Sequence, residues 1–336
     1  MEVIIDTYGT YLGKKSERLQ IRKEGKTFEE IPFSKIEQIT LASMGVSISA
    51  DIIYECMQRG ITLNFLSSSG KPYAMITSPD LTGTVLTRRE QLLAYFDQRG
   101  VTYSKAIAEG KIKNQVNLLK YFGKYRKTSE PDVFKILEEY LKNMEEIEKE
   151  LPKITGEKID DVRFQILSVE GRVADVYWKA VKHLLAKEIE FLGRGHQGAE
   201  DPVNSLLNYG YGILYSRIWG ALLLAGLEPF AGFLHVDRPG KPSLVLDAIE
   251  EFRQPVVDRV VFSFIGKGCE IKLDKGGQLE ESTRKSFSQK VLERLESQER
   301  YEGKKFKLKT IIQRQARHLA TFLRGERNYK PFICGW

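Results

Sequence analysis

The sequence predicts an α+β fold, in which a small β-rich N-terminal domain with one helix precedes a larger, mostly α-helical domain. Short β-prone runs separated by turn signals occupy the first 80 or so residues. From Arg88 onward, long segments with a period of 3.6 residues dominate. Ser-Pro-Asp and Thr-Gly-Thr interrupt the pattern between these regions. We therefore expect domains at residues 1–80 and 88–336, joined by a linker at 81–87.

The N-terminal domain is predicted from β-prone runs and one helical stretch. The helix follows Ser49, a suitable N-cap, and stops at Gly60. Glu24-Gly25-Lys26 is a turn signal, and Pro32 suggests a sheet edge or a break. The expected strands are Val3–Asp6, Arg18–Lys23, Glu37–Leu41, Ile61–Leu66 and Tyr73–Thr77.

The second domain is predicted from helical periodicity. Ser243 is expected to cap one of its helices and Pro255 to close that helix. Val256–Phe264 is apolar and β-branched, so its structure stays ambiguous. The expected helices are Arg88–Gln98, Tyr103–Tyr121, Pro131–Glu150, Phe164–Phe191, Asn204–Gly226, Ser243–Arg253, Lys285–Glu299 and Thr310–Leu323.

Composition excludes several classes of protein. With 42% hydrophobic and 29% charged residues, the chain has the profile of a soluble globular protein. No apolar run approaches the roughly 18 residues of a membrane helix, and the N-terminus has no signal-like pattern, so we expect a cytoplasmic protein. Three separated cysteines form neither a CxxC pair nor a closed disulfide set, which excludes a zinc ribbon.

Positive charge is concentrated in two segments. The chain carries 52 Lys+Arg and 45 Asp+Glu, a net charge of +7. Residues 267–330 contain 17 basic and 9 acidic side chains, and residues 88–127 contain 10 basic and 3 acidic ones. Such segments favour a surface that binds a polyanion. A solvated lysine-rich surface explains the charge equally well.

Glu170 is the most informative single residue. On a helix its neighbours on the same face are apolar, and no Lys or Arg stands at helical spacing. A carboxylate in such surroundings needs a compensating partner from elsewhere, such as an arginine, a hydrogen-bond donor or a metal ion. The alternative is a glutamate at the edge of the packed face that reaches water.

A second group of polar residues follows an apolar run. His235 ends Gly232-Phe-Leu-His235, and Asp247 and Glu250 lie three apart on the next expected helix. Their like charges repel unless a cation lies between them, and Arg253 offers Glu250 an ordinary salt bridge. One histidine with carboxylates from separate helices makes a site for Mg²⁺ or Mn²⁺. Beside a basic surface, such a metal suits phosphodiester chemistry.

The sequence resembles the family of CRISPR-associated protein one, the spacer-acquisition integrase. The resemblance runs nearly end to end. It is carried by Gly110-Lys-Ile-Lys-Asn-Gln115, Val169-Glu-Gly-Arg-Val-Ala-Asp-Val-Tyr-Trp178, Asp201-Pro-Val-Asn204, Leu207-Asn-Tyr-Gly-Tyr211, Gly232-Phe-Leu-His235, Ser243-Leu-Val-Leu-Asp-Ala-Ile-Glu-Glu-Phe-Arg253 and Pro255-Val-Val-Asp258. The ordered set of Glu, then Gly-Phe-Leu-His, then Asp-x-x-Glu is the most specific part.

This resemblance implies a metal-dependent DNA integrase and endonuclease that needs no ATP. By analogy, Glu170, His235 and Glu250 hold Mg²⁺ or Mn²⁺, with Asp247 as a further catalytic ligand or an orienting residue. The reaction is attack by the 3′-hydroxyl of a foreign DNA fragment on a phosphodiester at a CRISPR repeat. The resemblance also implies a homodimer, for which residues 1–80 are the expected interface, and a small companion, CRISPR-associated protein two.

Further residues near the predicted ligands are candidates for lining the site or for binding DNA. Tyr177, Asn204 and Asn208 are possible site-lining residues, although a packed aromatic and a capping amide explain them as well. Contacts with DNA phosphates are expected of the cations near the predicted ligands, Arg238, Lys241 and Arg253. The competing functions are a general metal-dependent nuclease and a non-catalytic DNA-binding scaffold.

Overall fold

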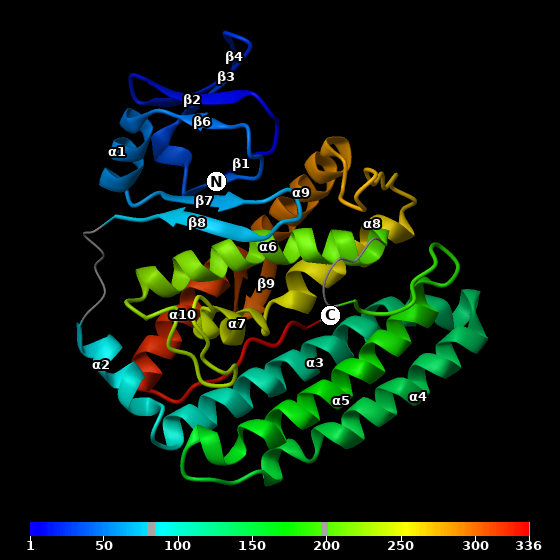
Figure 1. Ribbon diagram of the computed structural model, residues 1–336. Helices are drawn as coiled ribbons and strands as arrows, with labels where there is room; N and C mark the ends of the chain where they lie inside the picture. Colours follow the sequence, from blue (N-terminus) through cyan, green and yellow to red (C-terminus); the bar gives the residue numbers. More distant parts are fainter. Residues whose placement is uncertain (79–84, 196–200, 336) are drawn as a thin grey trace. The chain divides into compact units, whose positions relative to one another are not determined.

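The computed structural model describes residues 1–78, 85–195 and 201–335 (Figure 1). The chain divides into two compact units, each built from three segments. The first contains Met1–Leu81, Gly198–Ser216 and Glu270–Leu292; the second contains Thr82–Gln197, Arg217–Cys269 and Glu293–Trp336. The domain limits inferred from the sequence stay a prediction, and residues 81–84 of the expected linker lie outside the described residues.

The first unit is β-rich and has one α-helix in its N-terminal part, which confirms the expected fold class there. One sheet has the order β1-β5-β7-β8, in which only the β7–β8 pair is antiparallel, and the other has the order β4-β3-β2-β6. The elements are β1 (Glu2–Ile5), β2 (Thr10–Lys15), β3 (Arg18–Lys23), β4 (Lys26–Pro32), β5 (Gln38–Leu41), β6 (Ser47–Ile48), α1 (Ala50–Gln58), β7 (Thr62–Leu66) and β8 (Pro72–Ile76).

Alternating burial explains how these strands pack. Leu12 and Leu19 from one sheet, Ile39 and Leu63 from the other, and Ile52 of α1 belong to one hydrophobic core. In β1 and β3, buried side chains alternate with more exposed ones because successive residues of a strand face opposite sides. Strand β5, between β1 and β7, is buried along its whole length. Burial of these side chains is the main stabilisation of this part of the chain.

The second unit is largely helical, which confirms the rest of the expected fold class. Helices α3, α4 and α5 run side by side (Figure 1). Its elements are α2 (Val85–Ala94), α3 (Gln98–Ser129), α4 (Pro131–Glu148), α5 (Ile159–Leu185), α7 (Ser243–Ile249), α8 (Arg259–Gly266), β9 (Gln298–Tyr301), β10 (Lys304–Lys307) and α10 (Leu308–Leu323). Two helices, α6 (Pro202–Leu224) and α9 (Glu281–Glu296), contribute residues to both units.

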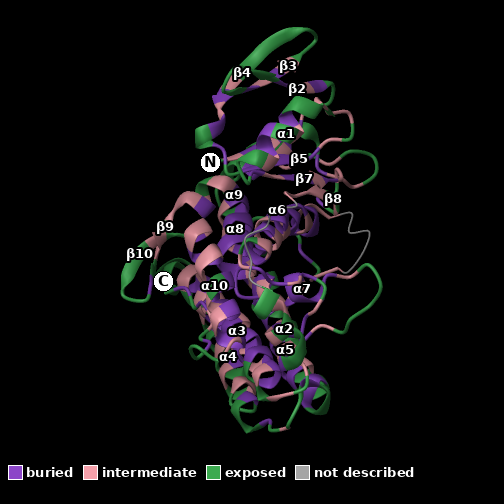
Figure 2. Cartoon of the chain, turned by 90° about the vertical axis from the view of Figure 1, so that its left-hand side faces the viewer, coloured by how far each residue is buried: buried purple, intermediate pink, exposed green. Residues whose placement is uncertain are grey.

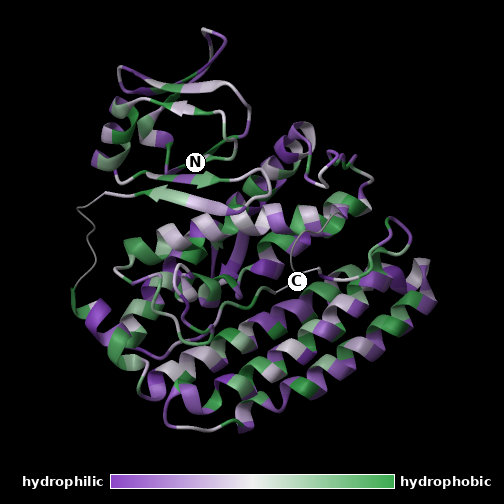
Figure 3. Cartoon of the chain, viewed as in Figure 1, coloured by the Kyte–Doolittle hydropathy of each residue, from purple (hydrophilic) through white to green (hydrophobic). Residues whose placement is uncertain are grey.

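The three long helices are amphipathic to different degrees. Figure 3 shows hydrophilic and hydrophobic residues alternating along α4, and only Leu137 and Met144 of this helix are buried. Asp97 is the N-cap of α3, and its carboxylate accepts the Arg99 N–H at 2.8 Å. Pro131 begins α4 at a position where its missing N–H costs nothing.

Two expectations for the second half of the chain are wrong. Ser243 begins α7 but makes no side-chain cap, because its Oγ accepts the Gly232 N–H at 2.8 Å. Helix α7 ends at Ile249 rather than near Arg253. Pro255 does not close a helix, since it lies in a π-helical turn, Arg253–Asp258, that continues into α8. The ambiguous run Val256–Phe264 is therefore helical.

A hairpin of β9 and β10 follows α9 and was absent from the expected elements. Its exposed end is visible in Figure 2. The turn has Glu302 and Gly303 at positive φ, 49° and 78°, as a type I′ hairpin turn requires. None of the helices in residues 1–78, 85–195 and 201–335 combines the length and the apolar character needed to cross a membrane.

Candidate active site

Helices α3 and α5 place Lys111 against Glu170. The Lys111 ammonium donates a hydrogen bond to Glu170 Oε1 and lies 2.7 Å from Glu250 Oε2. Burial opposes the charged form of Lys111, yet the two carboxylates raise its pKa. The compensating partner that Glu170 needs therefore comes from a helix about 60 residues earlier in the chain.

Asp247, on α7, binds the segment that carries His235. Its buried carboxylate accepts the backbone N–H groups of Phe233, Leu234 and His235 at 2.6, 3.1 and 2.9 Å. The His235 Nδ1 lies 2.7 Å from Asp247 Oδ1. Because an ionised carboxylate cannot donate, Nδ1 carries the hydrogen, which leaves the lone pair of Nε2 available for a ligand.

Glu250 lies at the end of α7, 4% exposed. Its Oε1 is 3.2 Å from the Arg253 guanidinium, so the salt bridge expected from their spacing is confirmed. Burial raises the pKa of Glu250, but the positive charges of Arg253 and Lys111, with a further contribution from His235 when it is protonated, outweigh burial and hold the pKa below its usual value. Glu250 Oε2 is buried and has no hydrogen-bond partner within the described ranges.

Glu170, Glu250 and His235 thus belong to one neighbourhood of the second unit. Glu170 and Glu250 contact the same ammonium group, and His235 is close enough to Glu250 to influence its ionisation. Within residues 1–78, 85–195 and 201–335, no group of three or more His, Cys, Asp or Glu side chains is gathered as a ready metal-binding set. In this structure, Lys111 lies between the two carboxylates.

The possible site-lining residues have other contacts. Tyr177 is fully buried and donates a hydrogen bond to Asp258 Oδ2 at 2.8 Å. The Asn204 side chain donates to Asp201 Oδ2 at 2.7 Å near the start of α6. Asn204 and Asn208 belong to the first unit, whereas Glu170, His235 and Glu250 belong to the second. Their role as site-lining residues stays a prediction.

The expected phosphate-binding cations differ in exposure. Arg238 is exposed and Lys241 is half-buried, and a backbone hydrogen bond of 3.0 Å joins them in the turn between His235 and α7. Arg253 is half-buried and paired with Glu250. Arg238 is therefore the most accessible of the three.

Sequence reasoning missed two buried charged residues. Lys111 was part of a recognised motif, but no local pattern reveals its partners on other elements. Glu251, next to Glu250, accepts hydrogen bonds from Tyr329 Oη, Gln315 Nε2 and the Phe332 N–H. Burial raises the pKa of Glu251 to about 7 despite these donors. Its sequence neighbours gave no sign that it binds the C-terminal segment.

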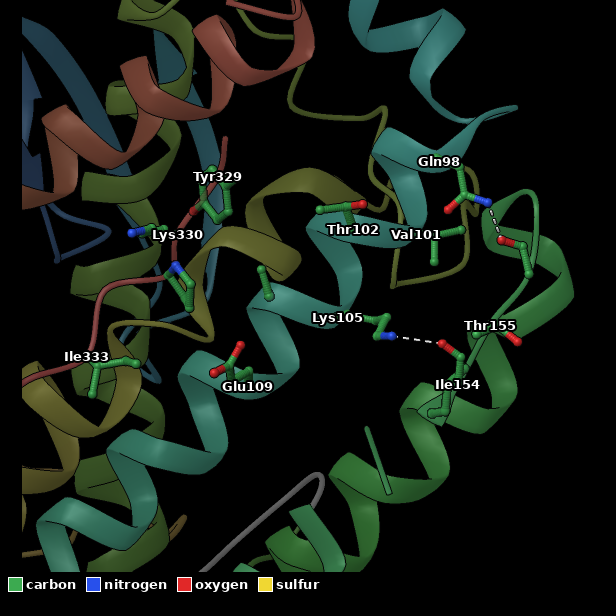
Figure 4. A pocket seen from close by; sticks show the side chains of 13 residues that line it. Gln98, Val101, Thr102, Lys105, Glu109, Ile154, Thr155, Tyr329, Lys330 and Ile333 are labelled. Atoms are coloured by element: carbon green, nitrogen blue, oxygen red, sulfur yellow. Dashed lines mark hydrogen bonds between the residues drawn. The ribbon is translucent and has the colours of Figure 1, made fainter. Parts of the chain in front are cut away.

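A cavity of about 710 Å³ lies elsewhere in the second unit (Figure 4). It is lined by the first half of α3, the 154–156 segment and the C-terminal segment. The Lys105 ammonium points toward the Ile154 carbonyl, to which it donates at 2.8 Å. None of Glu170, His235 and Glu250 lines this cavity. The three predicted metal ligands therefore lie outside this cavity.

Comparison with known proteins gives concordant results. The family model described as CRISPR associated protein Cas1 matches residues 3–293. The CRISPR-associated endonuclease Cas1 1 of Archaeoglobus fulgidus is 36% identical over 348 residues and covers 100% of both chains. Among solved structures, a casposase bound to integration product has a TM-score of 0.82 at 22% identity, covering 98% of this chain and 92% of that one. A Cas6-RT-Cas1–Cas2 complex has a TM-score of 0.79 at 19% identity, covering 99% and 36%. These structural matches concern the fold alone.

Proposed function

The chain belongs to the Cas1 family of CRISPR-associated proteins, and on this premise we propose that it is a metal-dependent DNA integrase and endonuclease. It joins the 3′-hydroxyl end of a foreign DNA fragment to a phosphodiester of a CRISPR array. One P–O bond forms as another breaks, so no nucleotide fuel is consumed. The same site cuts DNA when water replaces the 3′-hydroxyl.

The observation that carries this proposal is the pair of carboxylates beside an oriented histidine. Glu170 and Glu250 come from different helices to a single cationic group, and Glu250 keeps one buried oxygen without a hydrogen-bond partner among the described residues. His235 is held by Asp247 so that Nε2 remains available. Oxygen and imidazole ligands of this kind fit Mg²⁺ or Mn²⁺.

We assign the metal ligands to Glu170, His235 and Glu250, and an orienting role to Asp247. Both oxygens of Asp247 already accept hydrogen bonds from the 233–235 segment, so Asp247 is a poor ligand and a good support. A bound divalent cation supplies Lewis-acid stabilisation of the phosphate undergoing displacement. The protein holds the ligands and fixes the histidine tautomer.

DNA contacts are proposed for the turn beside the site. Arg238 and Lys241 lie between His235 and α7, with Arg238 exposed. Such cations bind phosphates and position the duplex without reading its sequence. Arg253 joins this group only when contact with DNA breaks its ion pair with Glu250.

Assembly is also part of the proposal. We infer a homodimer formed through the β-rich N-terminal region and a complex with a small companion, Cas2, that acts in the cytoplasm. The similarity of this chain to part of a Cas6-RT-Cas1–Cas2 complex supports such a partner.

A strand-transfer assay tests the function. Supercoiled plasmid with a leader and repeat is incubated with a short 3′-hydroxyl duplex, Mn²⁺ or Mg²⁺, and the companion protein. Wild type is expected to join the DNA covalently, and Glu170→Ala and His235→Ala to lose more than about 100-fold of this activity. Glu145→Ala, which removes an exposed carboxylate of α4, serves as the matched control.

Other outcomes identify the competing functions. Metal-dependent nicking without joining, with every companion and repeat tried, indicates a general nuclease. DNA binding without any reaction, unaffected by Glu170→Ala and His235→Ala, indicates a non-catalytic scaffold. Omission of the metal or addition of EDTA is expected to abolish joining and to leave DNA binding measurable.

A further inference from the structure

We propose that Lys111 is an internal counter-cation of the active site: it holds Glu170 and Glu250 together without metal and withdraws when a divalent cation binds. This inference rests on the proposed metal-dependent function. It assigns Lys111 a positioning role, because Lys111 acts on the two proposed ligands rather than on DNA.

The position of Lys111 is the first argument. Its ammonium group donates to Glu170 Oε1 and lies 2.7 Å from Glu250 Oε2, so a single nitrogen bridges carboxylates of α5 and α7. The side chain of Lys111 is 12% exposed and that of Glu250 is 5% exposed. A cation bound between these carboxylates must take the place of the ammonium group.

Charge balance is the second argument. Glu170 and Glu250 carry two negative charges, and Lys111 and Arg253 carry two positive ones, so the four buried or half-buried groups are already neutral. Adding a divalent cation beside the Lys111 ammonium places like charges together in a poorly solvated region, which is strongly unfavourable. Withdrawal of Lys111 removes that repulsion.

Incomplete hydrogen bonding is the third argument. Glu250 Oε2 lies 2.7 Å from the Lys111 ammonium, but the contact is not aligned as a regular hydrogen bond, and this buried oxygen has no other partner in the described part of the chain. Lysine is therefore an imperfect substitute for a cation that coordinates both carboxylates. Its long, flexible side chain lets the ammonium group move without a change in α3.

Two opposite effects of removing Lys111 follow. Without metal, Lys111→Met takes the bridging cation from Glu170 and leaves Glu250 with Arg253 alone, so the melting temperature should fall. With metal, the competitor is gone, so the affinity for Mn²⁺ should rise by at least about tenfold. A purely structural salt bridge predicts the first effect without the second.

The experiment measures Mn²⁺ binding by electron paramagnetic resonance, together with thermal melting with and without Mn²⁺. Wild type is compared with Lys111→Met and Lys111→Arg. Lys113→Met is the matched control, because Lys113 lies on the same helix but pairs with Glu109 at a half-exposed position. We expect tighter Mn²⁺ binding in Lys111→Met alone, with a larger stabilisation by Mn²⁺. Lys111→Arg should retain the weaker wild-type affinity.

A second measurement reads the wild-type protein and uses a variant only to assign the signal. Lysines of the wild-type protein are methylated with ¹³C and followed by NMR during titration with Mg²⁺. Lys111, assigned by the signal missing from Lys111→Arg, should move toward the position of a solvated lysine, whereas Lys113 should not. This readout keeps the inference testable if Lys111→Met does not fold.

The outcomes separate this inference from the proposed function. Equal or weaker Mn²⁺ affinity in Lys111→Met, or a Lys111 signal unchanged at saturating Mg²⁺, overturns the counter-cation role and leaves metal-dependent chemistry in place. Failure of wild type and of every variant to bind Mn²⁺ overturns both. Tighter binding in Lys111→Met with the expected NMR shift supports both.

Discussion

At the residue scale, the carboxylate of Asp247 determines the shape of the loop that presents His235. It accepts three consecutive backbone N–H groups and orients the imidazole. The loop approaches α7 so closely that a Cβ at Gly232 would lie 2.5 Å from the Ser243 carbonyl carbon. Glycine and aspartate together make the approach possible. This accounts for a Gly-Phe-Leu-His motif that precedes an aspartate-bearing helix.

Replacement of Asp247 should therefore affect stability as well as reaction. Asp247→Ala leaves three N–H groups without their acceptor, and we expect a loss of about 3 kcal/mol or more in the free energy of unfolding. Asp247→Asn retains a carbonyl oxygen and should cost less, about 1–2 kcal/mol. Urea denaturation of both variants, with Asp175→Ala as an exposed control, measures the difference. Equal effects of Ala and Asn would contradict the backbone role.

Individual residues also show which contacts could not be predicted from the sequence. The need of Glu170 for a distant partner was predictable from its apolar neighbours, but the identity of Lys111 was not, because their contact joins two helices. The choice between Asp247 and Glu250 was open for the same reason. It depends on which backbone groups face Asp247, and the fold alone determines this.

At the scale of elements, the C-terminal segment is held by buried polar side chains of α3 and the region after α7. Asn114 accepts the Cys334 N–H and donates to the Phe332 carbonyl, each at 2.9 Å or less. Glu251 accepts the Phe332 N–H at 2.8 Å and a hydrogen bond from Tyr329. Residues 329–334 therefore form a strap across the second unit without being a strand or a helix.

Loss of the Asn114 amide should release this strap. Asn114→Ala removes two buried hydrogen bonds to the strap and one to the Glu251 carbonyl, so opening of the segment should become more frequent by about tenfold or more. Limited proteolysis with chymotrypsin, followed at Tyr329 and Phe332, measures the opening. Asn143→Ala on the exposed side of α4 is the control. A cleavage rate equal to that of wild type would show that Asn114 does not hold the segment.

Elements in which apolar and polar residues follow a regular period were predicted well, and elements without such a period were not. The strand Arg18–Lys23 was predicted with its observed limits, and its neighbouring turn, Glu24-Gly25, has positive φ at both residues. The hairpin of β9 and β10 was not predicted because its two short strands are mostly polar. Each contains a single aromatic side chain, Tyr301 or Phe306, which is too little to show a period of two. Tertiary packing rather than local pattern stabilises such elements.

At the scale of the whole molecule, part of the positive charge of the two basic segments is neutralised locally. In residues 88–127, five of the ten basic side chains form ion pairs, Arg99, Lys111, Lys113, Lys120 and Arg126. The hairpin of β9 and β10 keeps several of its cations unpaired among the described residues. Arg300, Lys304 and Lys305 are exposed and form no ion pair in the described part of the chain, and Arg300 stands directly opposite Lys305. Like charges at such a pair destabilise a sheet, so a polyanion would relieve the repulsion.

The hairpin should therefore contribute to DNA binding. In the variant Arg300→Glu/Lys305→Glu, affinity for a duplex at low salt should fall by about tenfold or more. If the two cations each contact a phosphate, the slope of log affinity against log salt should flatten by about two. Fluorescence anisotropy over a salt series measures both quantities. The control Lys135→Glu/Lys142→Glu changes net charge equally on the exposed surface of α4. If both variants weaken binding to the same extent, net charge rather than the hairpin determines affinity, whereas a larger loss in the hairpin variant places a phosphate contact there.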